Sequence, residues 1–231
     1  MELSMVYMAS GFGRRFGSNK LLMPLEGKPL YLHGLEALKA AAELLETDGK
    51  GNFAAGETVP KASQIPIHCR IFVVSQYEEI LKEAEKMGFE TVYNPYSSEG
   101  ITASLRLGTR ASGPDTDAFL YFVADQPYMQ AKTIASFASG FFSSGKGIGC
   151  VCSRGRPGSP NLFHSRFYKE LLSLEGDKGG RQIMGKYPEE LWKKEVNERE
   201  LVDIDTLNDI IHPTNMESDG DRSDGSPRTK E

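Results

Sequence analysis

The stretch MASGFGRRFGSNKLLMPLEGKPL, residues 8–30, follows a short apolar run and decides how the rest of the chain is interpreted. It places three glycines and two arginines within seven residues, Gly11 to Gly17, and a lysine follows at Lys20. Glycine lets backbone N–H groups approach a ligand without a Cβ, and arginine and lysine bind phosphate oxygens. The stretch therefore indicates a loop that holds a phosphate chain. The alternative is a glycine-rich turn with solvated cations.

Two better-known phosphate loops do not fit this stretch. A Walker loop requires GxxxxGK[ST], whereas Gly17 is followed by Ser18. A dinucleotide fingerprint launches a helix directly from its glycines, but Pro24, Gly27 and Pro29 interrupt the residues that follow here. A long open loop around a triphosphate is the interpretation that remains.

The composition is that of a globular protein, with 39% hydrophobic and 26% charged residues in a chain of 231. The net charge of -5 argues against a face for nucleic acid, and no apolar run approaches the roughly 20 residues of a membrane span. The three cysteines, Cys69, Cys150 and Cys152, form no paired motif and are expected to be buried thiols. We expect a cytoplasmic protein.

Strand and helix patterns alternate along the chain. The expected strands cover residues 4–9, 68–75, 90–93, 117–124 and 147–153, and the expected helices cover 29–46, 78–87, 102–111 and 132–142. This order predicts an α/β fold with three α/β/α layers, a Rossmann-like, mostly parallel sheet and a single domain over residues 1–211. Residues 47–66 are expected to form a surface insertion, and residues 212–231 a disordered tail.

Carboxylates follow the opening loop in two places. Asp125 ends an apolar run, so its side chain could reach an ion beyond the strand, or it could simply hydrogen-bond the following turn. Asp203 and Asp205 would share one side of an extended segment, and either could join Asp125 around a magnesium ion. The alternative is that Asp205 or Thr206 caps a helix over residues 207–211.

Three further stretches are ordinary when taken alone. Residues 94–107 resemble a loop that leads into a capped helix, and residues 155–160 and 176–181 have the composition of cationic, glycine-rich turns. None of them indicates a site without further support.

Taken in order, however, the opening loop, DQP at residues 125–127, GDKGGR at 176–181 and DIDT at 203–206 resemble the nucleotidyltransferases related to molybdenum cofactor cytidylyltransferase. The resemblance covers residues 3 to about 211, apart from the expected insertion. It implies a nucleotidyltransferase-type fold. It also implies transfer of CMP from CTP to the phosphate of a molybdopterin-type molybdenum cofactor, with release of pyrophosphate.

The resemblance also implies roles for individual residues. The implied catalytic residues are Lys20, Arg15 and Asp125, and the implied ligands of Mg²⁺ are Asp125 and Asp205. The implied nucleotide-binding residues are Ala9, Ser10, Gly11, Gly13, Arg15, Lys20, Asn94, Gly100 and Ser104. The implied acceptor-binding residues are Arg156, Gly158, Pro160, Asp177, Lys178 and Arg181. A molybdoenzyme would receive the product, and neither nucleic acid nor a membrane is expected as a partner.

Some positions depart from the family pattern. Pro157 stands where an arginine is usual, Ser159 where a histidine is common, and Gly180 where an alanine is, which leaves the acceptor open. A sugar or alcohol phosphate could take the place of the molybdopterin-type acceptor. Ser10 fits neither the cytidylyl nor the guanylyl pattern, so GTP is an alternative to CTP. Two further classes of function stay open, a nicotinamide-dependent oxidoreductase on the same scaffold and a binder without catalytic activity.

Overall fold

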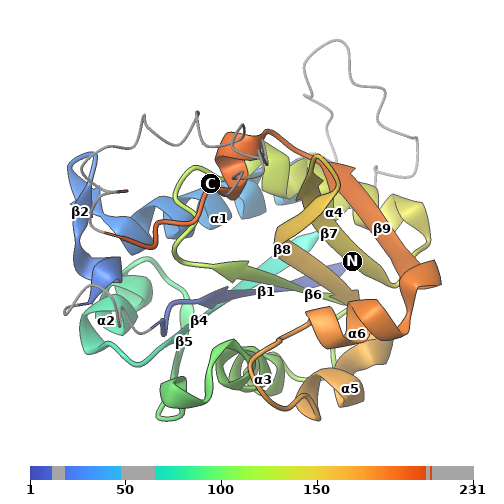
Figure 1. Cartoon of the computed structure of the whole chain (residues 1–231), viewed down its shortest axis with the longest axis horizontal. Coiled ribbons are helices and arrows are strands. Elements are labelled where there is room, and N and C mark those ends of the chain that lie inside the picture. The colour runs from blue at the N-terminus through green and yellow to red at the C-terminus, as the bar shows by residue number, and fades with distance from the viewer. Residues whose placement is uncertain (12–18, 48–65, 207–208, 210–231) are drawn as a thin grey trace, which may run out of the picture.

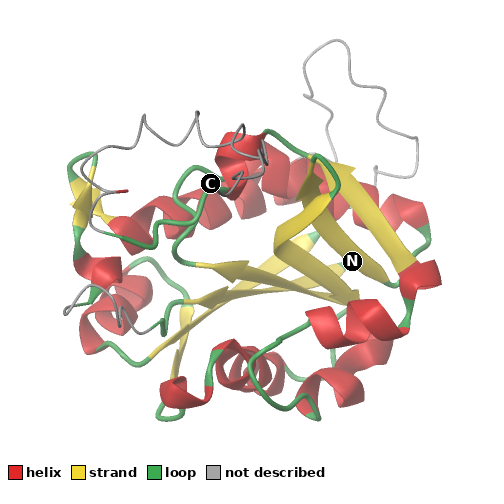
Figure 2. Cartoon of the chain, viewed as in Figure 1, coloured by secondary structure: helices red, strands yellow, loops and turns green. Residues whose placement is uncertain are grey.

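The computed structural model describes residues 1–11, 19–47, 66–206 and 209, and its centre is a seven-stranded sheet (Figures 1 and 2). Across the sheet, the strands are β5 (Glu90–Tyr93), β4 (His68–Ser75), β1 (Glu2–Met8), β6 (Ala118–Val123), β8 (Arg156–His164), β7 (Ile148–Ser153) and β9 (Leu191–Glu195). Strands from β5 to β6 pair in parallel, as do β7 and β9, whereas β8 is antiparallel to both of its neighbours. The expected mostly parallel sheet is confirmed.

Helices cover both faces of this sheet, which confirms the expected three layers. One face carries α1 (Leu30–Thr47), α2 (Glu78–Lys86) and α4 (Ala131–Ser144), and the other carries α3 (Ile101–Ser112), α5 (Tyr168–Leu172) and α6 (Arg181–Lys186). In Figure 1, α1 and α4 lie above the sheet and α3, α5 and α6 below it.

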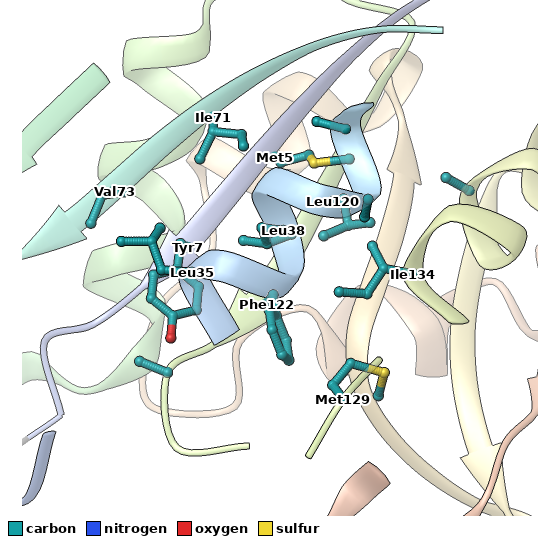
Figure 3. Close-up of a cluster of buried hydrophobic side chains, with 14 of the residues drawn as sticks. Met5, Tyr7, Leu35, Leu38, Ile71, Val73, Leu120, Phe122, Met129 and Ile134 are labelled. Carbon is teal, nitrogen blue, oxygen red and sulfur yellow. The ribbon is translucent and has the colours of Figure 1, made fainter. Parts of the chain in front are cut away.

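Strand β1 shows why both faces need covering. Met5 and Tyr7 belong to one apolar cluster, whereas Val6 and Met8 belong to the cluster on the opposite face. Successive side chains of a strand point to opposite faces, so a strand that is apolar throughout must be buried on both. Figure 3 shows the first cluster, in which Met5 and Tyr7 lie beside α1 and the side chain of Phe122 from β6.

The chain after the opening loop runs as the prolines and glycines predict. Lys20–Leu22 form one turn of 3-10 helix, and β2 (Pro24–Leu25) and β3 (Lys28–Pro29) then pair antiparallel before α1 begins. A dinucleotide fingerprint would start a helix directly after its glycines. No α-helix precedes α1 in the described part of this stretch, which agrees with the absence of that motif. The expected insertion and tail fall almost entirely on residues outside the described ranges.

The interpretation of residues 155–160 as a turn is wrong for most of that segment. Arg154 and Gly155 make the turn, both with positive φ, and Arg156 begins strand β8. The pairing that makes β8 a strand comes from β6 and β7, so nothing local to the sequence indicates it. Two prolines fall in this strand, and the register with β7 shifts at this level, between Cys150 and Cys152.

Two of the three cysteines are buried, as expected from the sequence. These are Cys150 and Cys152, whereas Cys69 is only half-buried. Burial raises the pKa of the Cys69 thiol to about 12 and that of Cys152 to about 11, so neither thiol is ionised at neutral pH. Among the described residues, no helix has the length and apolarity needed to cross a membrane.

Candidate active site

The carboxyl ends of β1 and β6 lie side by side and bring the opening loop next to Asp125. Met8 pairs with Val123 at the last position of the ladder, and the Ala124 amide donates to the carbonyl of Met8 at 3.1 Å. Strand β8 runs the other way, so its first residues reach the same edge, where the Ser159 hydroxyl accepts from the Val123 amide at 3.3 Å. Segments distant in sequence therefore meet at one edge of the sheet.

The start of the opening loop is fixed by hydrogen bonds to β4 and the residues after it. The hydroxyl of Ser75 donates to the carbonyl of Ala9 at 2.7 Å. The side-chain amide of Gln76 donates to the carbonyl of Ser10 at 2.9 Å. Ala9 and Ser10 are buried, whereas Gly11 is exposed. The predicted phosphate contacts at Gly13 and Arg15 lie outside the described residues.

Lys20 is the centre of the site. Its ammonium group donates to Asp125 Oδ2 at 2.9 Å, to the carbonyl of Ile204 at 2.9 Å and to Asp205 Oδ1 at 3.1 Å. The Lys20 side chain is 9% exposed, whereas that of Asp205 is 59% exposed. The structure therefore brings together Lys20, Asp125 and Asp205, three of the four residues for which the resemblance implied phosphate or metal contacts.

The charges around Lys20 keep it protonated. Burial by itself would lower the pKa of Lys20, but the charge of Asp125 and the hydrogen bonds with Asp125 and Asp205 outweigh burial, so that the pKa is raised. Lys20 is thus a permanent cation at neutral pH, held between two carboxylates.

The DIDT segment docks on the DQP loop by backbone and side-chain contacts. The Ile204 amide donates to the carbonyl of Asp125 at 2.9 Å, and the Ile204 side chain is fully buried. The neighbouring residues make a second contact, in which the side-chain amide of Gln126 donates to Asp203 Oδ1 at 2.8 Å. The segment is not a strand. The carboxylate of Asp203 reaches Gln126 of the DQP loop, whereas that of Asp205 reaches Lys20.

The sequence offered Asp203 as one of two possible partners of Asp125 around a magnesium ion, and it gave Gln126 no role. The structure joins these two residues by a hydrogen bond. Burial, and then the charge of Asp125, raise the pKa of Asp203. Gln126 is the middle residue of DQP, but the sequence does not show what its side chain contacts. The structure shows its contact with Asp203.

Thr206, and not Asp205, makes the contacts that a helix cap in DIDT would make. The Thr206 hydroxyl accepts from the Asp209 amide at 3.3 Å, and Asp209 Oδ2 accepts from the Thr206 amide at 2.7 Å. Because Thr206 makes the cap, the side chain of Asp205 is left to Lys20. Apart from Asp209, the helix expected over residues 207–211 lies outside the described residues.

Two cavities open on either side of Asp125. The smaller, of about 360 Å³, is lined by residues that include Ser10, Gly11, Lys20, Gly100, Ser104 and Asp125. Asn94 is not among its lining residues, because its side chain is fully buried and donates to the Ser104 hydroxyl at 2.9 Å. Asn94 therefore supports the wall that Ser104 presents, and direct nucleotide binding by Asn94 stays a prediction.

The larger cavity, of about 990 Å³, collects the acceptor-binding residues implied by the sequence. Arg156, Gly158, Asp177, Lys178 and Arg181 line it, whereas Pro160 is buried and does not. Its floor also has apolar and polar side chains that the sequence did not indicate, among them Leu105, Tyr121, Phe163 and Asn161. Asn161 and Phe163 could not be assigned because they belong to β8, which was not expected as a strand.

Asp177 separates the two cavities and lines both. Its Oδ1 accepts from the Ile101 amide at 2.8 Å and so caps the N-terminus of α3. Gly100 has φ +89°, and a Cβ there would lie 1.9 Å from Asp177 Oδ1. Glycine is needed at this position both for its backbone conformation and for the approach of Asp177.

A magnesium ion would depend on few protein ligands. Within the described ranges, no group of three or more His, Cys, Asp and Glu residues is placed to hold a metal. Asp125 and Asp205 nevertheless direct carboxylate oxygens, together with the carbonyl oxygen of Ile204, at one cation, the ammonium of Lys20. Oxygen donors suit Mg²⁺, which commonly binds one or two carboxylates plus substrate phosphates.

Comparisons with known proteins bear on the family and the fold. A family model described as the MobA-like NTP transferase domain matches residues 5–191. The fold is similar to that of a nucleotidyl transferase from Methanothermobacter, with a TM-score of 0.67 at 21% identity over 93% of this chain and 96% of that one. It is also similar to a 4-diphosphocytidyl-2C-methyl-D-erythritol synthase from Anaerococcus prevotii, with a TM-score of 0.67 at 14% identity over 93% of this chain and 95% of that one.

In sequence, 51 residues are 43% identical to the bifunctional enzyme IspD/IspF of Granulibacter bethesdensis. That stretch is 21% of this chain and 14% of that enzyme. The family model ends before Asp203, so the part that DIDT plays in the site rests on the structure alone.

Proposed function

The chain belongs to the MobA-like NTP transferase domain family and is a nucleotidyltransferase, and from this premise we propose that it transfers CMP from CTP to the phosphate of a molybdopterin-type molybdenum cofactor. Pyrophosphate is the second product. One observation carries the proposal. The two cavities meet at Asp125, so a nucleotide in the smaller and an acceptor in the larger would present their phosphates to the same carboxylate.

The nucleotide side of the site supplies positive charge and alignment. Lys20, and Arg15 of the opening loop, neutralise the triphosphate, while Ser10 and Gly11 form part of the wall beside it. Such prearranged charges stabilise the transition state of phosphoryl chemistry because they need no reorganisation during the reaction. Magnesium, held by Asp125 and Asp205, would supply further neutralisation of the phosphate charge when bound.

The acceptor's phosphate oxygen attacks the α-phosphorus in line, a new P–O bond forms, and the bond to the leaving pyrophosphate breaks. The attacking oxygen is already anionic, so the chain need not provide a general base. Arg156, Lys178 and Arg181 line the acceptor cavity and are exposed, and within the described residues none of them forms an ion pair. They are therefore free to bind an anionic acceptor without giving up a partner.

The size of the larger cavity favours a ring-containing acceptor. A volume of about 990 Å³ is large for a small polyol phosphate and leaves room for a heterocycle. This supports the molybdopterin type over a short sugar phosphate.

A second candidate acceptor is an alcohol phosphate such as 2-C-methyl-D-erythritol 4-phosphate. The observation that favours it is the 51-residue match to IspD/IspF, at 43% identity. The reaction would use the same nucleotide side of the site and differ only in what occupies the larger cavity.

The test incubates the full chain with Mg²⁺, each of the four NTPs in turn, and either the molybdenum cofactor or the alcohol phosphate, and measures pyrophosphate and the nucleotidylated product. We expect turnover with CTP and the molybdenum cofactor. Asp125→Asn should abolish it and Asp115→Asn should not, because Asp115 is exposed and precedes β6, at the opposite end from the site.

Each remaining outcome has a defined meaning. Product from the alcohol phosphate alone would replace the acceptor, and a preference for GTP would replace the nucleotide. Ligand binding without pyrophosphate from any NTP would contradict the whole proposal, as would turnover of NADPH by the same preparation.

A further inference from the structure

Lys20 is held more completely than a phosphate-binding lysine needs to be. Asn19 caps the short 3-10 helix by accepting from the Leu21 amide at 3.1 Å, which fixes the backbone from which Lys20 projects. The side chain then reaches Asp125 and Asp205, 105 and 185 positions away in sequence. Only 9% of it is exposed.

The ammonium group has no donor to spare. A lysine ammonium carries three N–H donors, and all three are used, by Asp125 Oδ2, Asp205 Oδ1 and the carbonyl of Ile204. A phosphate oxygen can therefore receive a hydrogen bond from Lys20 only if one of these oxygens gives it up.

The same two carboxylates are the proposed ligands of the magnesium ion. We propose that Lys20 is an internal stand-in for the divalent cation. Its ammonium group positions Asp125 and Asp205 and weakens metal binding until a nucleoside triphosphate binds and its phosphate oxygens accept hydrogen bonds from that group. This rests on the metal site of the proposed function, but not on the identity of the nucleotide or the acceptor.

Electrostatics makes the two cations compete. A divalent ion on Asp125 and Asp205 either takes the oxygens that Lys20 holds or binds the remaining oxygens of the same carboxylates within a few ångströms of the ammonium. In the first case Lys20 must leave, and in the second the two cations repel each other in a partly buried site. Either way, each lowers the affinity for the other by the same factor.

A triphosphate removes this conflict. Lys20 lines the smaller cavity together with Ser10 and Gly11, so phosphates bound there would offer new acceptors within the same cavity. The negative charge of the phosphates also compensates the added metal charge. Metal and nucleotide are then expected to bind cooperatively, with Lys20 as the group that couples them.

The experiment measures Mn²⁺ binding to the full chain without nucleotide, by the loss of the free-ion electron paramagnetic resonance signal. The proteins are the wild type, Lys20→Met, Lys20→Arg and the control Lys28→Met. Lys28 pairs with Glu36, and neither residue lines either cavity. We expect Lys20→Met to bind Mn²⁺ about tenfold more tightly than the wild type, a typical coupling factor between two sites. Lys20→Arg and Lys28→Met should resemble the wild type.

A second measurement guards against a folding defect. Mn²⁺ should raise the thermal midpoint of Lys20→Met more than that of the wild type, because a ligand stabilises the state that it binds more tightly. CTP should increase the Mn²⁺ affinity of the wild type and have a smaller effect on Lys20→Met.

Two results would overturn the inference. If Lys20→Met binds Mn²⁺ no more tightly than the wild type while CTP still promotes Mn²⁺ binding and turnover, the stand-in role is wrong and the proposed function stands. If no protein binds Mn²⁺ even with CTP, both the stand-in role and the metal site of the proposed function are wrong.

Discussion

The two walls of the active site are built on different principles. On the nucleotide wall, the polar groups already have partners inside the protein: Lys20 has three, and the amide of Asn94 donates to Ser104. On the acceptor wall, the exposed side chains of Arg156, Lys178 and Arg181 line a larger cavity. The polar groups of the nucleotide wall are held by hydrogen bonds within the protein, whereas the cations of the acceptor wall form no ion pair among the described residues.

This difference indicates how each ligand is bound. A ligand at the nucleotide wall must exchange with existing hydrogen bonds, so its binding should be cooperative and sensitive to geometry. An anion at the acceptor wall meets cations that are free in the described structure, so its binding should be additive and should weaken with salt. Substitutions on each wall, and where the walls touch, can break or sharpen this contrast.

The largest effect is expected from Asp125→Asn, because Asp125 lines both cavities and holds Lys20 of the nucleotide wall. The substitution keeps the shape of the side chain but removes a charge that holds Lys20 and would hold the metal. We expect kcat/KM for pyrophosphate release to fall on the order of 10³-fold, as when other prearranged charges are removed from an active site. A fall below tenfold would show that this wall does not control the chemistry.

The next effect is expected where the two walls touch, from Gly100→Ala. A Cβ would lie 1.9 Å from Asp177 Oδ1 at a φ of +89°, so Asp177 must move and the backbone is strained. A loss of about 1–3 kcal/mol corresponds to a fall of about 2–12 °C in the thermal midpoint. Gly113→Ala is the matched control, because its φ is also positive but its Cβ would meet no atom within 4 Å. Equal falls for both would mean that the contact with Asp177 contributes nothing.

A smaller effect is expected from Arg181→Gln on the acceptor wall. Because Arg181 is exposed and has no ion pair within the described residues, its loss should raise KM for the acceptor about tenfold and leave KM for the nucleotide unchanged. Lys186→Gln serves as the control, since Lys186 lies on the same helix but pairs with Glu170. A change in both KM values would contradict the separation of the walls.

The smallest effect is expected from Asp203→Asn. The folded-state pKa of Asp203 is raised above 3.8, so the carboxylate destabilises the fold once the pH exceeds that raised pKa, and the cost disappears as the pH falls below the unfolded value. The asparagine can still accept from Gln126. We expect the thermal midpoint at pH 7 to rise by about 1–2 °C, and the difference to vanish near pH 3. A lower midpoint at pH 7 would show that the charge of Asp203 stabilises the site.

The parallel part of the fold could be predicted because its signals are local. The alternation along β1 and the apolar stripe of α1 at Leu35, Leu38 and Leu45 follow from the periods of strand and helix. The opening loop and DQP then had to share an edge, because parallel strands present their carboxyl ends together.

The acceptor wall could not be predicted in the same way. Residues 156–160 carry two prolines and a glycine, which favour a turn locally, yet pairing with β6 and β7 makes them part of a strand. Leu105, Tyr121 and Phe163 have the apolar side chains of core residues, and only the cavity shows that they also form a floor.

The amino-acid sequence by itself determined the order of the elements, the chemical groups at the strand ends and the exclusion of a helix directly after the opening glycines. The tertiary structure decided which groups meet, and thus that Lys20 is bound to two carboxylates and a carbonyl rather than left free for a phosphate. The physical reason is the separation along the sequence over which each kind of interaction acts. Periodicity and turn chemistry act over a few residues, whereas an ion pair between residues 105 or 185 positions apart exists only once the sheet has brought them together.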